Sequence, residues 1–90
     1  MKTVLVSIYD KKAKDFGPIY TAKNPAVATR DFTTACQENP NYKKYPEDYC
    51  IVAIAEYDTE TGTIKPFEKP KVLAEAENFV INPEREKENG

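Results

Sequence analysis

The chain has 90 residues, a length typical of a single domain with a modest core. It contains no histidine, so the usual general base near neutral pH and the commonest metal ligand are both missing. We therefore expect no enzyme, no metal site and no other cofactor. The net charge of -2 conceals an asymmetry: residues 1–45 carry eight basic and four acidic side chains, and residues 46–90 carry five basic and eleven acidic. Such an asymmetry indicates either a polyanion-binding face or ordinary solvated surface.

The first expected element is a central strand over residues 3–9, TVLVSIY. Val4, Val6 and Ile8 fall on one face and Leu5 on the other, so both faces are apolar. This N-terminal run has one lysine and no small-residue cleavage site, which favours a strand over a signal peptide. No apolar run is long enough to span a membrane, so no membrane partner is expected.

The charged segment DKKAKDFGP ends this strand, with Gly17 supplying turn freedom and Pro18 fixing the exit. Residues 18–22 then pair back as a short second strand. Asn24 is a good N-cap and Pro25 suits the first turn of a helix, where its missing N–H costs nothing. The helix carries an apolar stripe at Ala28, Phe32, Ala35 and Cys36.

Asn39 and Pro40 end the helix, and residues 39–48 predict an exposed loop. Residues 49–57, YCIVAIAEY, are apolar at nearly every position, which is typical of a strand covered on both faces. The two cysteines lie among apolar neighbours, which favours buried reduced thiols over a redox pair.

Residues 63–67 form a short edge strand, because Pro66 cannot donate to a ladder. Residues 71–81 fit either a short amphipathic helix or an extended segment. The predicted fold is a single α+β domain over residues 1–81, ββαββ, with a four-stranded sheet of order 2-1-3-4 covered on one face by the helix. A parallel crossover through that helix would be right-handed. A C-terminal appendage follows, and the charged residues 82–90 predict a disordered tail.

The stretch AEYDTETGTIKPFE offers two readings, a calcium loop or a hairpin turn. With Asp58 as the first ligand of an EF-hand loop, Gly62 and Glu68 each arrive one residue early. The flanking segments are expected strands, whereas an EF-hand needs helices. The hairpin reading, with Gly62 at a positive-φ position, accounts for the residues better.

Two segments together resemble the small nonstructural DNA-binding protein of gokushoviruses, which are phages with single-stranded DNA genomes. They are SIYDKKAKDFGPIYTAKNPAVATRDFTTA (residues 7–35) and PEDYCIVAIAEYDTETGTI (residues 46–64). The matching positions are Tyr9 and Asp10, the Ile-Tyr-x-Ala-Lys-Asn run from Ile19, then Ala28, Arg30, Phe32, Glu56, Tyr57, Asp58, Thr61 and Gly62. The resemblance covers a little over half of the chain and implies a role in genome replication or packaging in the host cytoplasm, through single-stranded DNA.

Single-strand binders combine a cationic groove with aromatic rings on which bases stack. The first half of the chain offers both, although solvated loops and ordinary sheet packing explain the same residues one by one. The candidate DNA-binding residues are Lys11, Lys12, Lys14, Phe16, Tyr20, Lys23, Arg30, Tyr42, Lys43 and Lys44. Because the sequence pI is about 5.2, a homo-oligomer that multiplies weak sites is also expected. The alternative is a protein–protein adaptor that regulates a viral or host replication factor without touching DNA.

Overall fold

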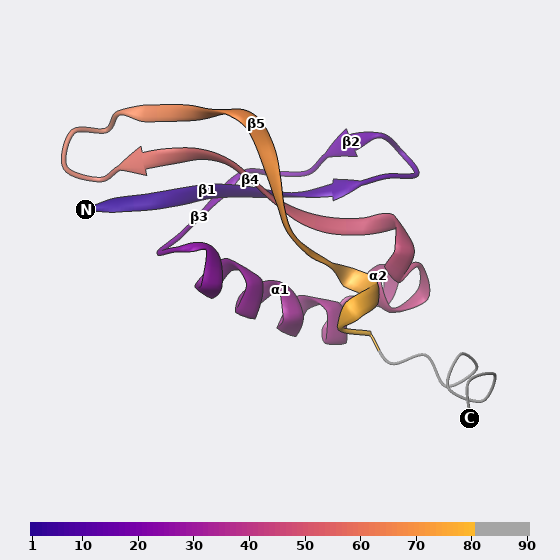
Figure 1. Cartoon of the computed structure of the whole chain (residues 1–90). Coiled ribbons are helices and arrows are strands. Elements are labelled where there is room, and N and C mark those ends of the chain that lie inside the picture. Colours follow the sequence, from indigo (N-terminus) through magenta and orange to yellow (C-terminus); the bar gives the residue numbers. More distant parts are fainter. Residues whose placement is uncertain (81–90) are drawn as a thin grey trace.

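An antiparallel sheet with one long helix on one of its faces makes up most of the protein (Figure 1). The computed structural model describes residues 1–80, so Ile81 and the predicted tail over residues 82–90 lie outside the described residues. The α+β class is confirmed. The elements are, in order, β1 (Lys2–Asp10), β2 (Asp15–Phe16), β3 (Tyr20–Ala22), α1 (Pro25–Glu38), α2 (Pro40–Lys44), the 3-10 turn η1 (Pro46–Asp48), β4 (Tyr49–Asp58), β5 (Ile64–Glu75) and the 3-10 turn η2 (Ala76–Asn78).

The sheet has five strands in the order β2-β1-β4-β5, with β3 also paired to β1. The expected order 2-1-3-4 corresponds to β3-β1-β4-β5 and is confirmed. The two most apolar strands, β1 and β4, lie in the centre. The expected count of four strands is wrong by one. Since β3 and β4 both run antiparallel to β1, they are parallel to each other, and α1 connects them across β1.

The additional strand, β2, exists because the segment after β1 folds back on itself as a tight hairpin. The Asp10 carboxylate Oδ1 accepts hydrogen bonds from the backbone N–H groups of Lys12 and Ala13, both at 3.0 Å. The positive φ of this turn, 58°, falls at Lys14 and not at Gly17, where turn freedom was expected. The Gly17 N–H instead donates to the carbonyl of Ile8 at 2.9 Å, which holds the returning chain against β1.

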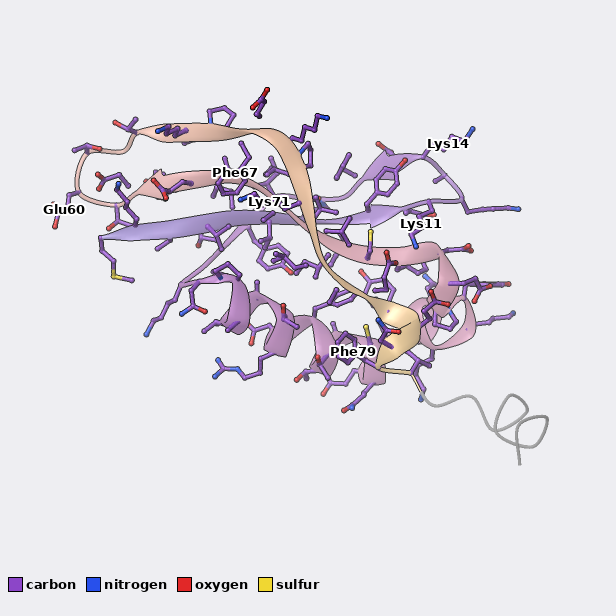
Figure 2. The ribbon with its side chains drawn as sticks, in the orientation of Figure 1. Lys11, Lys14, Glu60, Phe67, Lys71 and Phe79 are labelled. Carbon is purple, nitrogen blue, oxygen red and sulfur yellow. The ribbon has the colours of Figure 1, made fainter. Side chains whose placement is uncertain are left out.

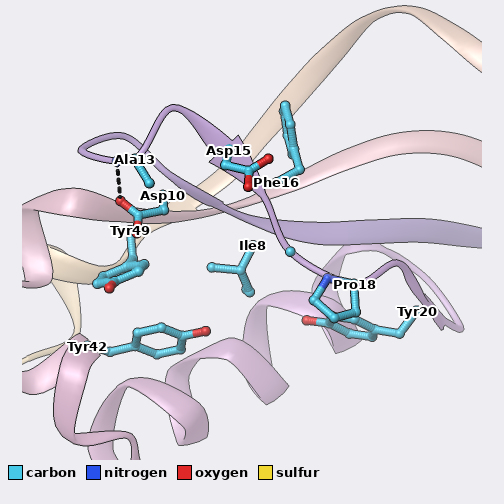
Figure 3. Close-up of a pocket in the computed structure, with 10 residues that line it drawn as sticks. Ile8, Asp10, Ala13, Asp15, Phe16, Pro18, Tyr20, Tyr42 and Tyr49 are labelled. Atoms are coloured by element: carbon cyan, nitrogen blue, oxygen red, sulfur yellow. Dashed lines mark hydrogen bonds between the residues drawn. The ribbon is translucent and has the colours of Figure 1, made fainter.

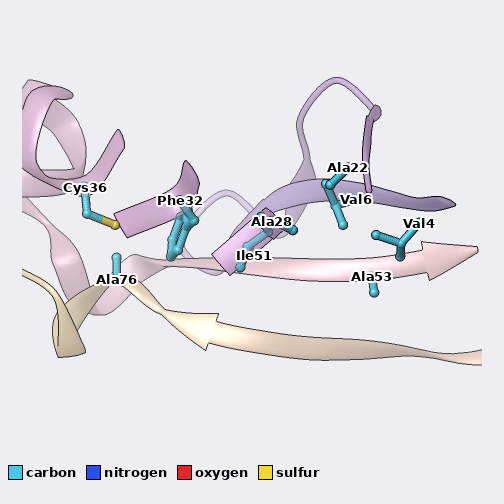
Figure 4. Close-up of a cluster of buried hydrophobic side chains, with 9 residues drawn as sticks. All are labelled: Val4, Val6, Ala22, Ala28, Phe32, Cys36, Ile51, Ala53 and Ala76. Atoms are coloured by element: carbon cyan, nitrogen blue, oxygen red, sulfur yellow. The ribbon is translucent and has the colours of Figure 1, made fainter. Parts of the chain in front are cut away.

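The local signals around α1 predict its start correctly. The Asn24 side chain accepts the N–H of Val27 at 2.9 Å and Pro25 takes the first position. The buried residues of the predicted stripe are Ala28, Phe32 and Cys36, while Ala35 is half-buried. This stripe packs on the helix-facing side chains of β1 and β4, as Figure 4 shows. The core cluster is Val4, Val6, Ala22, Ala28, Phe32, Cys36, Ile51, Ala53 and Ala76.

The prediction of an exposed loop over residues 39–48 is wrong, because its Asn and Pro residues start new helical turns. Asn39 caps α2, accepting the N–H of Asn41 at 2.9 Å, and Pro40 is its first residue. Pro46 begins η1 in the same way and is buried. The result is a half-buried Tyr42 packed against the core. Among residues 1–80, no helix is both long and apolar enough to cross a membrane.

The fourth strand of the prediction is much longer than expected. β5 runs to Glu75, with breaks in its register opposite Ile51–Val52 and Ala53–Ala55, so the ambiguous stretch is a strand followed by η2. The connection between β4 and β5 is a hairpin, as predicted. Its Gly62 has a φ of 75°, and the Asp58 carboxylate accepts the N–H of Glu60 at 2.9 Å.

The first prediction concerns the core. Phe32→Ala should lower the free energy of unfolding by about 3–5 kcal/mol, because the ring is 1% exposed and its removal leaves a cavity. Ile64→Ala, at a side chain that is 55% exposed, should change it by less than about 1 kcal/mol. Urea denaturation of the two variants measures both values. Equal losses would show that the core does not centre on the α1 stripe.

Candidate nucleic-acid interface

A cavity of about 470 Å³ opens at the end of the sheet where β1 turns into β2. Its wall comes from the β1–β2 hairpin, the segment leading into β3, α2 and the first residue of β4. We call it the tyrosine pocket. The residues of its wall are Ile8, Asp10, Ala13, Asp15, Phe16, Gly17, Pro18, Tyr20, Tyr42 and Tyr49.

Three tyrosines reach this cavity from three different elements (Figure 3). Tyr20 lies on β3 opposite Val6, and Tyr49 starts β4 opposite Asp10. Tyr42 is placed by α2, and its ring lies 4.6 Å from the ring of Tyr49, centroid to centroid, at an interplanar angle of 47°. The pocket therefore offers planar aromatic surface on two sides of an apolar floor formed by Ile8.

The charged groups of the wall are carboxylates only. Asp10 and Asp15 line the cavity from the hairpin side, and no lysine or arginine is among the lining residues. Burial raises the pKa of Tyr20 and that of Tyr42, so both phenols keep their protons at neutral pH. A phosphate group would meet two negative charges inside this cavity, whereas an uncharged planar ring would not.

Four lysines of the predicted set lie on elements that contribute to the wall, although none of them lines the pocket. Lys12 and Lys14 are exposed on the β1–β2 hairpin, and Lys43 and Lys44 are exposed on α2, next to Tyr42. These four lysines form what we call the rim. Lys11 differs, because its ammonium is hydrogen-bonded to the Glu75 carboxylate, which raises its pKa.

Three residues of the predicted set point elsewhere. Lys23 lines a separate hollow of about 200 Å³ near the start of α1, and Arg30 pairs with its neighbour Asp31 at 3.7 Å. The ring of Phe16 turns away from the cavity and packs on Tyr9, with 4.6 Å between centroids (Figure 3). The predicted residues therefore do not form one groove.

The direction of β3 explains why Lys23 is separated from the rim. The ladder pairs Tyr20 with Val6 and Ala22 with Val4, so the chain runs back toward the N-terminal end of β1. The hairpin lysines follow the opposite end of β1. Figure 2 shows the two ends of the sheet, with Lys14 at one and Glu60 of the β4–β5 hairpin at the other.

Sequence reasoning missed Asp10, Asp15 and Tyr49 as wall residues. Asp10 ends one strand and Tyr49 starts another, so an antiparallel pairing of these two strands would have brought them together. It also missed three exposed lysines of β5, whose signal is the run KPFEKPK. They are Lys65, Lys69 and Lys71, and the ammonium of Lys71 lies 4.8 Å from the centroid of the Phe67 ring.

The two cysteines lie outside the pocket, free and buried. Burial raises the pKa of both thiols, that of Cys36 to about 11, so neither carries the thiolate that a nucleophile requires. Within residues 1–80, no three His, Cys, Asp or Glu side chains form a group that could hold a metal ion. Chemically, the site is suited to binding a planar group.

The fold and the pocket define a small α+β domain with an aromatic binding cavity. Residues 3–79 match the family model described as Phage ORF5 protein. The match covers most of the chain, which therefore belongs to the phage ORF5 protein family and is a phage protein. No match is found among curated proteins or among solved structures.

The second prediction follows from the buried Cys36 thiol. Its pKa in the folded state, about 11, exceeds its ordinary value of 9.0, so the unfolded chain binds fewer protons between those pH values. The free energy of unfolding should therefore fall, by roughly 1–2 kcal/mol from this group, as pH rises from 8.5 to 10.5. Urea denaturation of the natural chain and of Cys36→Ala isolates this part, since the variant keeps the tyrosines that titrate in the same range. Parallel pH profiles would contradict the assignment.

Proposed function

We propose that this phage protein is a non-enzymatic nonstructural protein that binds single-stranded DNA, acting in genome replication or packaging in the host cytoplasm. The observation that carries the proposal is the tyrosine pocket, an aromatic cavity whose flanking elements, the β1–β2 hairpin and α2, carry exposed lysines. Base–aromatic stacking and backbone-tracking cations are the two components of single-strand binding. The resemblance to the gokushovirus DNA-binding protein supports the same function and the assignment to that group.

The distribution of charge indicates how a strand would lie. The carboxylates of Asp10 and Asp15 keep phosphates out of the cavity, so a base enters it and stacks against the tyrosines. The phosphates on either side of that base pass over the rim, with Lys12 and Lys14 on one side and Lys43 and Lys44 on the other. Single-stranded DNA permits this arrangement because its bases can be splayed away from the backbone.

Each site of this kind is weak by itself, because Lys12 of the rim shares a hollow with Asp10, Glu47 and Asp48. Several copies on one strand would multiply the affinity without further contacts. We therefore include binding by more than one copy, as a homo-oligomer or along the strand, in the proposal.

The adaptor alternative has less support in the fold. Its motivation is a free sheet edge for strand addition, and β5 is one such edge. That strand contains Pro66 and Pro70, which lack the N–H groups that a pairing strand needs. The edge formed by β2 and β3 is short and interrupted between them. Pull-down before and after nuclease treatment separates the two functions, since only an adaptor keeps its partners.

The third prediction tests stacking. Tyr20→Ala should raise the Kd for an oligo-dT strand by about 5- to 100-fold at low salt, because one base loses its aromatic contact. Tyr20 is 39% exposed on a short edge strand, so the fold should persist. Fluorescence anisotropy measures the change. Tyr20→Phe keeps the ring and should retain the affinity, and Ile64→Ala, at the far hairpin, should do the same.

Two outcomes would defeat the proposal. One is the absence of any single-strand binding by the natural chain at low salt. The other is an equal loss for Tyr20→Ala and Ile64→Ala, which would show that the tyrosine pocket has no part in binding.

The fourth prediction concerns the rim. The double variant Lys43→Gln, Lys44→Gln should reduce the slope of log K against log salt by about 1.4, since each phosphate contact on a single strand contributes about 0.7. Lys65→Gln with Lys69→Gln removes the same charge from β5 and is the matched control. Anisotropy titrations at several salt concentrations give both slopes. Equal reductions would indicate a general charge effect and contradict a phosphate path over α2.

A further inference from the structure

The wall of the tyrosine pocket has hydrogen-bond acceptors on one side and hydrogen-bond donors on the other. Figure 3 shows the carboxylates of Asp10 and Asp15 on the hairpin side and the hydroxyls of Tyr42 and Tyr20 pointing toward each other across the cavity, with Ile8 between the two sets. A planar ligand can stack in this pocket. The wall can also distinguish one ring from another by the hydrogen-bond donors and acceptors on the edge of the ring.

The acceptor side is fixed by the hairpin itself. The Oδ1 atom of Asp10 accepts hydrogen bonds from the N–H groups of Lys12 and Ala13, which fixes the carboxylate and leaves Oδ2 free of these two bonds. An ionised carboxylate accepts hydrogen bonds and donates none. No lysine or arginine lines the cavity to neutralise these two groups. A ligand that displaces water from these two carboxylates therefore gains by bringing N–H donors to this side.

The donor side is formed by phenols that keep their protons. Among the residues drawn in Figure 3, neither Tyr20 nor Tyr42 forms a hydrogen bond through its hydroxyl. Burial keeps both phenols protonated at neutral pH by raising the pKa of each. Each hydroxyl can therefore donate to an acceptor on the ligand.

We propose that the tyrosine pocket selects guanine from single-stranded DNA. Guanine presents two adjacent donors, N1–H and the N2 amino group, next to the acceptors O6 and N7. The donors suit the carboxylates of Asp10 and Asp15, and the acceptors suit the phenols. Thymine turns two carbonyl oxygens toward any group that meets its single N–H, so it can stack on the tyrosines but gains no paired hydrogen bonds from the carboxylates. A guanidinium side chain has donors alone and leaves the phenols without an acceptor.

This inference rests on the proposed function and is tested with strands that differ in one base. Oligo-dT strands carrying a single central dG, dC, dA or dT are compared by anisotropy at one salt concentration. The dG strand should bind about 5- to 100-fold more tightly than the all-dT strand. This range is expected when a pair of hydrogen bonds recognises one base. Because length and charge are constant, phosphate contacts cannot produce the difference.

Two variants assign any preference to the carboxylates. Asp15→Asn should reduce the dG-to-dT ratio toward one, because an amide replaces one of the two carboxylate acceptors. Asp10→Asn keeps a side-chain oxygen for the Lys12 and Ala13 N–H groups, so the hairpin persists, and it should reduce the ratio in the same way. Glu60→Gln removes one negative charge at the far hairpin and should leave the ratio unchanged.

A nucleoside titration provides a second measurement that does not depend on the backbone. Guanosine, which has no phosphate, should shift the NMR signals of Ile8 and Tyr20, and thymidine at the same concentration should shift them less. Equal Kd values for the four strands, with binding intact, would overturn guanine selection and leave the proposed function standing. Displacement of DNA by arginine amide but not by guanosine would also overturn it, assigning the pocket to a cationic side chain. No binding of any strand would overturn both.

Discussion

The antiparallel ladder between β1 and β4 is the constraint on which the rest of the structure depends. It runs from the pair Lys2–Asp58 to the pair Asp10–Tyr49, almost the full length of both strands. Its helix-facing side chains form the floor on which Phe32 packs, so the core exists only in this register. A shift by one residue would turn the apolar face of β1 away from α1.

The same ladder determines what the two ends of the sheet can do. At one end it brings Asp10 against Tyr49, where the hairpin and α2 complete the tyrosine pocket. At the other end it brings the N-terminus near the acidic β4–β5 hairpin, where the terminal ammonium lies 3.4 Å from Glu60. The acidic loop therefore acts in local turn geometry and pairing, and its Asp58 carboxylate is engaged by the backbone of its own turn.

The sequence was informative where local physics decides structure. The Asn24-Pro25 start of α1, its apolar stripe and the apolar runs of β1 and β4 depend on neighbours within a few residues, and all were predictable. Three elements were not, namely β2, α2 and the full length of β5. β2 depends on the tight hairpin that follows β1, the end of β5 pairs with Cys50 and Ile51 at the far end of β4, and α2 is stabilised by core contacts of Tyr42. In the site, the composition of the first half indicated Tyr20 and Tyr42, but the opposing carboxylates depended on the direction of pairing.

The basic and acidic residues that are separated along the sequence are not separated in the same way in the folded structure. Asp10 and Asp15 belong to the basic half and line the pocket, while Lys65 and Lys69 belong to the acidic half and lie on an exposed edge strand. A protein that grips phosphates alone would concentrate its cations in one groove and keep carboxylates away from it. This fold instead places carboxylates in an aromatic pocket and lysines on the hairpin and on α2, which flank it. That arrangement favours a ligand whose ring carries the donors and whose negative charge stays outside the cavity, which is what the proposed binding of a single-stranded base requires.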